Sequence, residues 1–303
     1  VKLVNLLREH NVKVYQMKTD LSLDQRNYQK GDIVVPLAQA FRPFIKEVLE
    51  TQVFPARHYT PGGQLIKPYD ITSWSLPLHR GLTAIEIRKA PAQPLEPSLT
   101  EIDRAFRLVE SPPEECFGLI FRANNNESYR AAFLGLQRGL KVERLSQTLK
   151  GHGQEMRKGS FFIAQNKENS RDIAQLLREL DVSPIFLGHE MELPTAPVTL
   201  PRIALVESCF HDMDAGWTRF IFDTYHIPYS VVRPGDFSDT DFVQTYDTVI
   251  FPSVSKSLLM TGKNESDGKA SLTSYPPAYT KGIGDKGMAR LMAFLDQGGS
   301  IPS

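Results

Sequence analysis

The amino-acid sequence predicts an α/β fold in which two related small α/β units precede a doubly wound domain with a parallel sheet. First, residues 203–206 form an unbroken apolar run, which is typical of a strand buried on both faces of a parallel sheet. Second, apolar strands and amphipathic helices alternate after this run, and parallel strands need such helical crossovers. Third, two earlier segments share one spacing of elements, which indicates a duplication.

Composition excludes two classes of function. The 303 residues include 35 Lys plus Arg and 35 Asp plus Glu, so no net charge attracts nucleic acid or an anionic membrane. No apolar run approaches the roughly 18 residues that a membrane span needs, and no signal peptide opens the sequence. We therefore expect neither a nucleic-acid partner nor a membrane span, while the oligomeric state stays open.

The first predicted unit covers residues 1–90. A helix to His10 leads into a strand at 12–15, a turn at 29–32 and a second strand at 33–35. A further helix follows, with Pro43 near its start. Its apolar residues recur with helical spacing on one face, at Phe41, Ile45, Val48 and Leu49. The Pro-rich stretch 91–115 is then predicted as a linker with a strand or two inside it.

The second predicted unit, residues 116–190, repeats the first at a distance of 128 positions. The matching pairs are Val12 and Leu140, Gly31 and Gly159, Ile33 and Phe161, Ile45 and Ile173, and Leu49 and Leu177. A duplication of this kind can place two lobes around a ligand-binding cleft, or it can be scaffold alone. The residues favour scaffold.

A linker is predicted at 191–200, followed by the parallel-sheet domain at 201–303. Its strands are expected at 203–206, 229–232 and 248–251. Asp212 is the expected N-cap of a helix whose apolar face carries Met213, Trp217, Phe220, Ile221 and Tyr225. A last helix presents Met288, Leu291, Met292 and Leu295 on one face and ends at Gly298 and Gly299. A further strand is expected at 299–303, and we expect the chain to be a fragment, truncated at both ends.

Candidate ligand-binding residues lie where the strands of this domain end. Open α/β sheets bind ligands beyond the carboxyl ends of their strands, and Cys209, His211 and Asp214 follow the first strand. Trp217 and Ser253 complete the candidate set. A thiol near an imidazole can support nucleophilic catalysis. The alternative, which the residues favour, is that the acidic residues cap the helix, Cys209 packs as a small apolar residue and His211 is solvated.

Other motifs carry less weight. His189 and Glu192 have the H-x-x-E spacing of a zinc site, but a third ligand is required and the segment is Pro-rich, so no metal site is predicted. The stretch 256–284 is long for a connection and is a candidate binding loop. Two cysteines, Cys116 and Cys209, do not make a disulfide scaffold, and whether they pair stays open.

Three parts of the sequence carry a family resemblance. Residues 30–39 (KGDIVVPLAQ) with 41–50 (FRPFIKEVLE), and then 68–78 (PYDITSWSLPL), resemble the region after the catalytic domain in large bacterial proteins of the zinc carboxypeptidase family. The motif at 212–219 (DMDAGWTR), with 276–280 and 282–284, resembles their C-terminal domain, whose fold is similar to flavodoxin-like class I glutamine amidotransferases.

The resemblance implies a non-catalytic accessory region. The parent activity would be zinc-dependent hydrolysis of C-terminal peptide bonds, with zinc held upstream of Val1, so no catalytic residue and no cofactor is assigned to this chain. Its implied partner is its own upstream peptidase domain, with a peptide or small molecule as a further ligand, and the implied location is periplasmic or secreted. The alternative is an amidotransferase-like or small-molecule-binding domain centred on Cys209 and His211.

Overall fold

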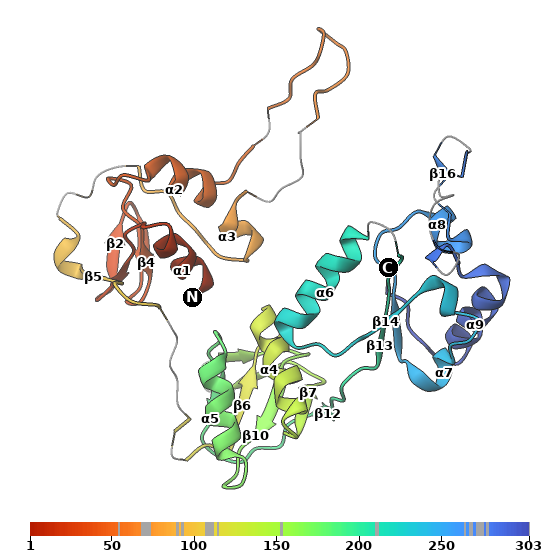
Figure 1. Cartoon of the computed structure of the whole chain (residues 1–303). Coiled ribbons are helices and arrows are strands. Elements are labelled where there is room, and N and C mark those ends of the chain that lie inside the picture. Colours follow the sequence, from red (N-terminus) through yellow and green to blue (C-terminus); the bar gives the residue numbers. More distant parts are fainter. Residues whose placement is uncertain are drawn as a thin grey trace. The chain divides into compact units, whose positions relative to one another are not determined.

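The computed structural model gives two compact units, Val1–Leu108 and Val109–Ser303, which are described separately (Figure 1). The described residues are all except Phe54, 68–73, 89–90, 92–93, 107–111, Glu114, 152–153, 210–211, Asn264, 267–268, 271–275, 277–278 and Ser303. Helices and strands are mixed throughout, and one of the sheets is parallel. The predicted α/β fold class is confirmed.

The first unit is built on a three-stranded antiparallel sheet in the order β4-β1-β5. Its strands are β1 (Tyr15–Met17), β4 (Ile33–Val34) and β5 (Leu99–Glu101), and a separate hairpin joins β2 (Leu21–Leu23) to β3 (Arg26–Tyr28). The helices are α1 (Lys2–Glu9), α2 (Arg42–Leu49), α3 (Leu76–His79) and the 3₁₀ turn η1 (Glu96–Ser98). Strand β5 lies inside the stretch 91–115, where the sequence predicts a linker with a strand or two, and it pairs along the second edge of β1.

The first core is small. Buried side chains of α1, α2 and the approach to β1 form it, namely Val4, Leu7, Val12, Val14 and Ile45. The apolar residues of α1 lie three positions apart and so share one helix face, while Pro43 occupies the first turn of α2, where a missing N–H costs nothing. The helices therefore form where the sequence predicts them.

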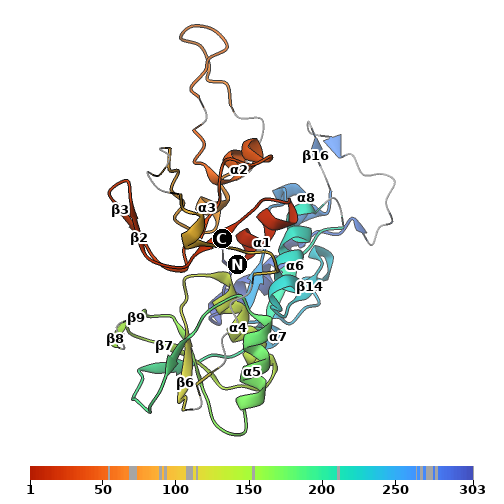
Figure 2. The ribbon, with the colours of Figure 1, turned by 90° about the vertical axis from the view of Figure 1, so that its left-hand side faces the viewer.

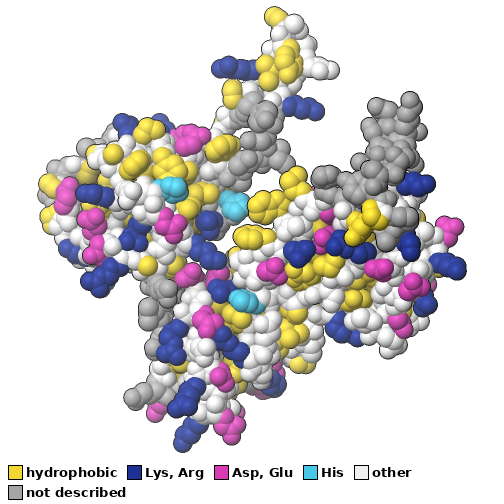
Figure 3. All heavy atoms as spheres, viewed as in Figure 1, with side chains coloured by type: hydrophobic (Ala, Val, Ile, Leu, Met, Phe, Trp, Pro, Cys, Tyr) yellow, Lys and Arg dark blue, Asp and Glu magenta, His cyan; other side chains and the backbone are white. Residues whose placement is uncertain are grey.

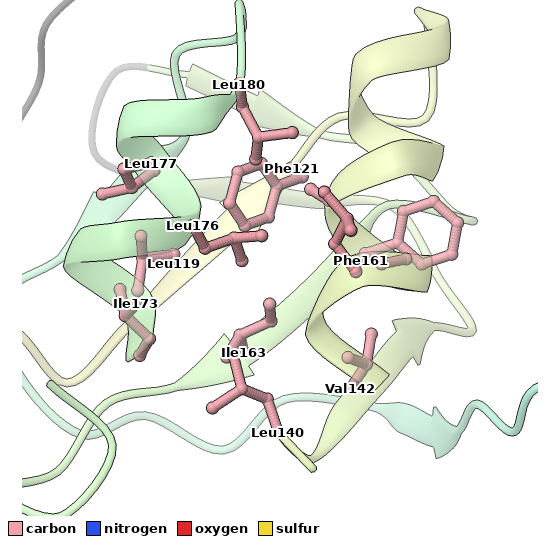
Figure 4. Packing of buried hydrophobic residues seen from close by; sticks show 13 residues of the cluster. Leu119, Phe121, Leu140, Val142, Phe161, Ile163, Ile173, Leu176, Leu177 and Leu180 are labelled. Atoms are coloured by element: carbon pink, nitrogen blue, oxygen red, sulfur yellow. The ribbon is translucent and has the colours of Figure 1, made fainter. Parts of the chain in front are cut away.

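The second unit begins with a five-stranded antiparallel sheet in the order β11-β6-β10-β7-β12. Its strands are β6 (Gly118–Phe121), β7 (Val142–Leu145), β10 (Phe161–Ala164), β11 (Ile185–Leu187) and β12 (Thr195–Pro197), with a hairpin of β8 (Leu149–Gly151) and β9 (Gln154–Met156). Helices α4 (Asn126–Gln137) and α5 (Ser170–Glu179) pack on one face of this sheet (Figure 4). A second cluster, which includes Ile120, Leu145, Phe162 and Leu187, fills the other face.

The prediction of a linker at 191–200 is wrong in part, because residues 195–197 form strand β12. Residues 195–197 pair antiparallel with β7, from Thr195 opposite Leu145 to Pro197 opposite Glu143. The two prolines, Pro194 and Pro197, suggested an irregular connection, yet proline is tolerated on an edge strand, where one row of N–H groups has no partner in the sheet.

The segment 1–51 of the first unit and the segment 129–179 of the second have helices, strands and a hairpin in the same order and in the same register. Strands β1 and β4 pair Tyr15 with Val34, and β7 and β10 pair Glu143 with Phe162, which is the same pair 128 positions later. The hairpins agree too, since Leu21 faces Tyr28 and Leu149 faces Met156 (Figure 2). Gly31 and Gly159 have φ values of 98° and 89°, which only glycine adopts readily. The two units are therefore related, as the spacing predicts.

The chain ends in a three-stranded parallel sheet in the order β14-β13-β15. Its elements are β13 (Ile203–Val206), α6 (Met213–Tyr225), β14 (Ser230–Val232), η2 (Pro234–Asp236), α7 (Phe242–Thr245), β15 (Thr248–Ile250), α8 (Lys256–Thr261), the hairpin β16 (Glu265–Ser266) and β17 (Lys269–Ala270), and α9 (Gly284–Asp296). Beyond α9, Ser300 forms a parallel bridge with Thr248, where the sequence predicts a further strand.

Two helix faces differ from the prediction. On α6, four of the five residues of the predicted apolar face are exposed, with exposed fractions of 72% for Met213, 62% for Trp217, 57% for Phe220 and 46% for Ile221, and the fifth, Tyr225, is half-buried. On α9 the buried residues are Gly287, Leu291 and Phe294, while Met292 and Leu295 are exposed. Phe294 is buried because its ring packs against that of Phe242, at a centroid distance of 6.2 Å, in a hydrophobic cluster that includes Ala204 and Val206 of β13. No helix in the described part of the chain has both the length and the apolar character of a membrane span.

Candidate functional site

Open α/β sheets bind ligands at the carboxyl ends of their parallel strands, and the three-stranded sheet of this chain has such an end. Strand β13 lies in the middle, and the chain crosses from it to β14 on one side and later to β15 on the other. The loops after β13 and β15 therefore leave the sheet in different directions, which opens a crevice in doubly wound folds. We call residues 207–209 together with Arg233 and Ser253 the strand-end site.

An ion-pair network fixes the loop after β13. The Glu207 carboxylate, 15% exposed, lies 3.2 Å from Arg219 Nη1 and 3.2 Å from Arg233 Nη1. Arg233 Nη1 also donates to the backbone carbonyl oxygens of Glu207 at 3.2 Å and Ser208 at 2.7 Å. Contact with Tyr229 and then the charge of Glu207 raise the pKa of Arg219 above its ordinary value. Each oxygen of the Glu207 carboxylate is thus paired with an arginine.

Helix α6 begins directly after this loop, with Asp212 as its first capping residue. The Asp212 carboxylate accepts from the Ala215 backbone N–H at 3.0 Å, which makes it the N-cap, as the sequence predicts. Its other oxygen accepts from the Ser208 N–H at 2.9 Å and holds the loop against the helix. Because Asp212 already satisfies this helix end, the geometry favours the structural interpretation of the acidic pair.

The predicted site residues do not converge on one point. Cys209 is an exposed free thiol, and Ser253, after β15, is also exposed. Asp214 points outward in the first turn of α6, and Trp217 packs edge-to-face on Phe220 at 5.8 Å. His211 lies outside the described residues, so the structure does not test the thiol–imidazole pair. Among the described residues of this set, no nucleophile lies beside a base.

The stems of the loop 256–284 meet at two glycines. A Cβ atom on Gly262 would lie 2.3 Å from the Thr280 carbonyl oxygen, and one on Gly282 would lie 2.3 Å from the Met260 backbone. The chain segments on either side of the loop are therefore in backbone contact, which glycine alone permits. The predicted binding loop is closed at its base, and much of it lies outside the described residues.

A hollow that the sequence does not predict lies at the other end of α6. It has a volume of about 500 Å³, is wide open to solvent, and is lined by Gln137, Phe222, Asp223, His226, Ile227, Pro228, Tyr229 and Val231. Gln137 Nε2 donates to the His226 carbonyl at 2.6 Å, and the Tyr229 hydroxyl donates to Asp223 at 3.0 Å. His226 closes α6 with a φ of 55°. The run Ile227-Pro228-Tyr229 after a helix was the available signal, although it also fits a simple connection.

Metal ligands do not gather in the described part of the chain, where no group of three or more His, Cys, Asp or Glu side chains could hold an ion. His189 and Glu192 are both exposed in the segment after β11. Cys116 is partly buried and donates to the Gly118 carbonyl at 3.4 Å, and burial raises the pKa of its thiol. Cys116 and Cys209 are both free thiols and do not form a disulfide with each other.

Comparison with known proteins adds no relative: no family model, no curated protein and no solved structure matches this chain.

Proposed function

We propose that this chain is a non-catalytic accessory region of a zinc carboxypeptidase-like protein, and that it binds the peptidase domain through α6. The observation that carries the proposal is the exposed apolar stripe of Met213, Trp217, Phe220 and Ile221. Hydrophobic side chains lie at the surface around α6 in Figure 3. Tryptophan and other aromatic residues supply much of the binding energy at protein interfaces.

The family resemblance also points to α6 as the binding surface. The segment 212–219, which resembles the C-terminal domain of these proteins, supplies the N-cap and the first turns of α6. A stripe at positions 213, 217, 220 and 221 recurs with helical spacing, so one flat surface can contact it. In this proposal the zinc and the catalytic residues belong to the peptidase domain, and the chain contributes a binding surface.

The absence of a catalytic centre is tested on the chain alone. We expect no hydrolysis of a peptide with a free C-terminus after incubation with zinc, and no zinc retained after dialysis, as measured by mass spectrometry. Stoichiometric zinc together with peptide turnover would refute the proposal.

The binding surface is tested against a zinc carboxypeptidase domain from the family that the sequence resembles. The double variant Trp217→Ser, Phe220→Ser should weaken binding at least tenfold in titration calorimetry, because it removes two aromatic side chains from the centre of the stripe. Met292→Ser is the matched control, since Met292 is 50% exposed on α9, outside the stripe. Equal affinities for the two variants, or no binding by the unmodified chain, would count against α6 as the contact.

The second candidate is a small-molecule or amidotransferase-type site at the strand ends. It is favoured by the exposed Cys209 thiol at the point where the loops after β13 and β15 diverge. Cys116 serves as an internal control, because burial raises its thiol pKa and so lowers its thiolate fraction at any pH below that value. Iodoacetamide at pH 8 should therefore modify Cys209 faster than Cys116.

The pH dependence of the Cys209 alkylation rate distinguishes a solvated thiol from an activated one. Rate–pH profiles of the single variants Cys116→Ser and Cys209→Ser isolate each thiol. A Cys209 rate that is already maximal near pH 7, together with glutamine hydrolysis, would establish this candidate. A rate that rises through pH 8–9, as for an ordinary cysteine, would eliminate it.

A further inference from the structure

Strand β4 has an unpaired edge in the described part of the first unit, whereas its counterpart in the second unit is paired on both edges. In the described residues β4 pairs only with β1. Its counterpart β10 pairs with β7 on one side and with β6 on the other. The second unit thus shows that a strand at this position of the sheet can pair with a further antiparallel strand on its second edge.

The backbone groups on that edge are directed outward. Met17 N donates to the Asp32 carbonyl and Gly31 N to the Met17 carbonyl, so residues 17 and 32 bond across the ladder. Antiparallel ladders alternate, and therefore Ile33 and Val35 direct their N–H and C=O groups away from β1. Pro36, which lacks an N–H, belongs to the other row, so it removes no donor from the open edge.

Burial differs in the same way between the two units. Ile163, Leu176 and Leu177 are 1%, 0% and 4% exposed, in a cluster that includes Leu119 and Phe121 of β6. Figure 4 shows Leu119 and Phe121 beside the side chains of α5. The counterparts of these three residues, 128 positions earlier, are Val35, Val48 and Leu49, and they are only partly buried.

We propose that the β4 edge binds an extended apolar peptide segment as an added antiparallel strand, in the register that β6 has on β10. The segment would place one apolar side chain opposite Val35 and another opposite Ile33, as Leu119 and Phe121 lie opposite Ile163 and Phe161. Main-chain hydrogen bonds to the two outward-facing residues would hold it, and its apolar side chains would cover Val48 and Leu49. This inference is independent of the accessory function.

The experiment tethers a segment of known pairing behaviour to the full chain. Val1 is the counterpart of Tyr129, so a copy of residues 117–128 placed directly before Val1 puts the copied strand in register with β4. We expect the amide hydrogens of Ile33 and Val35 to exchange at least tenfold more slowly than in the unmodified chain. Val34, whose amide belongs to the β1–β4 ladder, serves as the reference for overall stability.

A matched control has the same tether with the change Leu119→Pro in the copied strand only. Proline removes a ladder donor from the copy, so this variant should leave Ile33 and Val35 exchanging as in the unmodified chain. Equal protection by both tethers would show that pairing is not responsible, and no protection by the intact tether would overturn the proposal. Protection of both amides in the unmodified chain would overturn it as well, because the edge would already be covered.

Discussion

The two related units have the same local structure but different cores. In both, a helix ends at a residue with positive φ, Asn11 at 58° and Gly139 at 78°, and the next residue donates back to the helix, Val12 to Leu7 and Leu140 to Gly135. In both, the strand register is the same after a shift of 128 positions. In the described residues, strand β6 on the edge of β10, and β11 beyond it, have no counterpart in the first unit, and the core of the second unit is correspondingly larger.

This comparison separates two sources of burial. Ile45 and Ile173 are each 1% exposed, because the helix and its own sheet are enough to cover that position. Leu49 and Leu177 differ, since only Leu177 has the side chains of β6 in its cluster. A helix position near the middle of the sheet is therefore buried by local structure, whereas one near the edge depends on a neighbouring strand.

The largest expected effect comes from truncating Leu177, the α5 residue whose burial depends on strand β6. Leu177→Ala should lower the free energy of unfolding of the second unit by about 3 kcal/mol, because it leaves a cavity in a closed core. Leu49→Ala should cost only about 1 kcal/mol in the first unit, where the side chain already contacts solvent. Hydrogen exchange of amides in α5 and α2 measures the two. The pair Ile45→Val and Ile173→Val, at about 1 kcal/mol each, is the control, and unequal costs there would undermine the comparison.

A smaller effect is expected where the two helices end. Gly139→Ala should cost about 1 kcal/mol, because a Cβ atom is unfavourable at positive φ. Asn11→Gly should change stability by less than about 0.5 kcal/mol, since asparagine already tolerates this conformation. Thermal unfolding of the two variants is the measurement. A large loss from Asn11→Gly would mean that the Asn11 side chain, rather than the backbone, ends α1.

The smallest effect concerns an ion pair that only the second unit contains. Arg138 and Glu179 link α4 to α5, while the counterpart positions hold His10 and Thr51, which cannot form such a pair. Burial raises the pKa of Glu179, but hydrogen bonds from Arg138 and Gln175 outweigh it, and the net shift is downward. A lowered folded-state pKa stabilises the protein above the unfolded value of about 4.3 and loses that effect as the pH falls through the folded value.

Glu179→Gln should therefore lower stability by about 0.5 kcal/mol at pH 7 and have almost no effect near pH 2, since the pair is largely solvated. Urea denaturation at both pH values checks this. Thr51→Ala is the control in the first unit, and its effect should not depend on pH. A Glu179→Gln effect that grows as the pH falls would reverse the sign of the proposed pKa shift.

Sequence reasoning located the elements better than their surroundings. The apolar run at 203–206, the cap at Asp212 and the glycine turns at Gly31 and Gly159 are local signals, and each occupies its expected place. The strand-end residues were chosen from the rule for open α/β sheets, and the structure places Cys209 and Ser253 after the ends of their strands. It did not bring them together into a catalytic arrangement, because loop direction and ion pairs such as Glu207 with Arg233 depend on distant residues.

The sequence by itself determined where the main helices and the three parallel strands of the last domain lie, which positions repeat and which turns require glycine, because these depend on neighbouring residues and on backbone sterics. Only the tertiary structure decided that the apolar stripe of α6 is exposed, that residues 195–197 form an edge strand and that β4 pairs on one edge only in the part of the chain that the structure describes. The physical reason is that periodicity defines an apolar face but does not say which other element covers it. That depends on contacts between residues far apart in the chain.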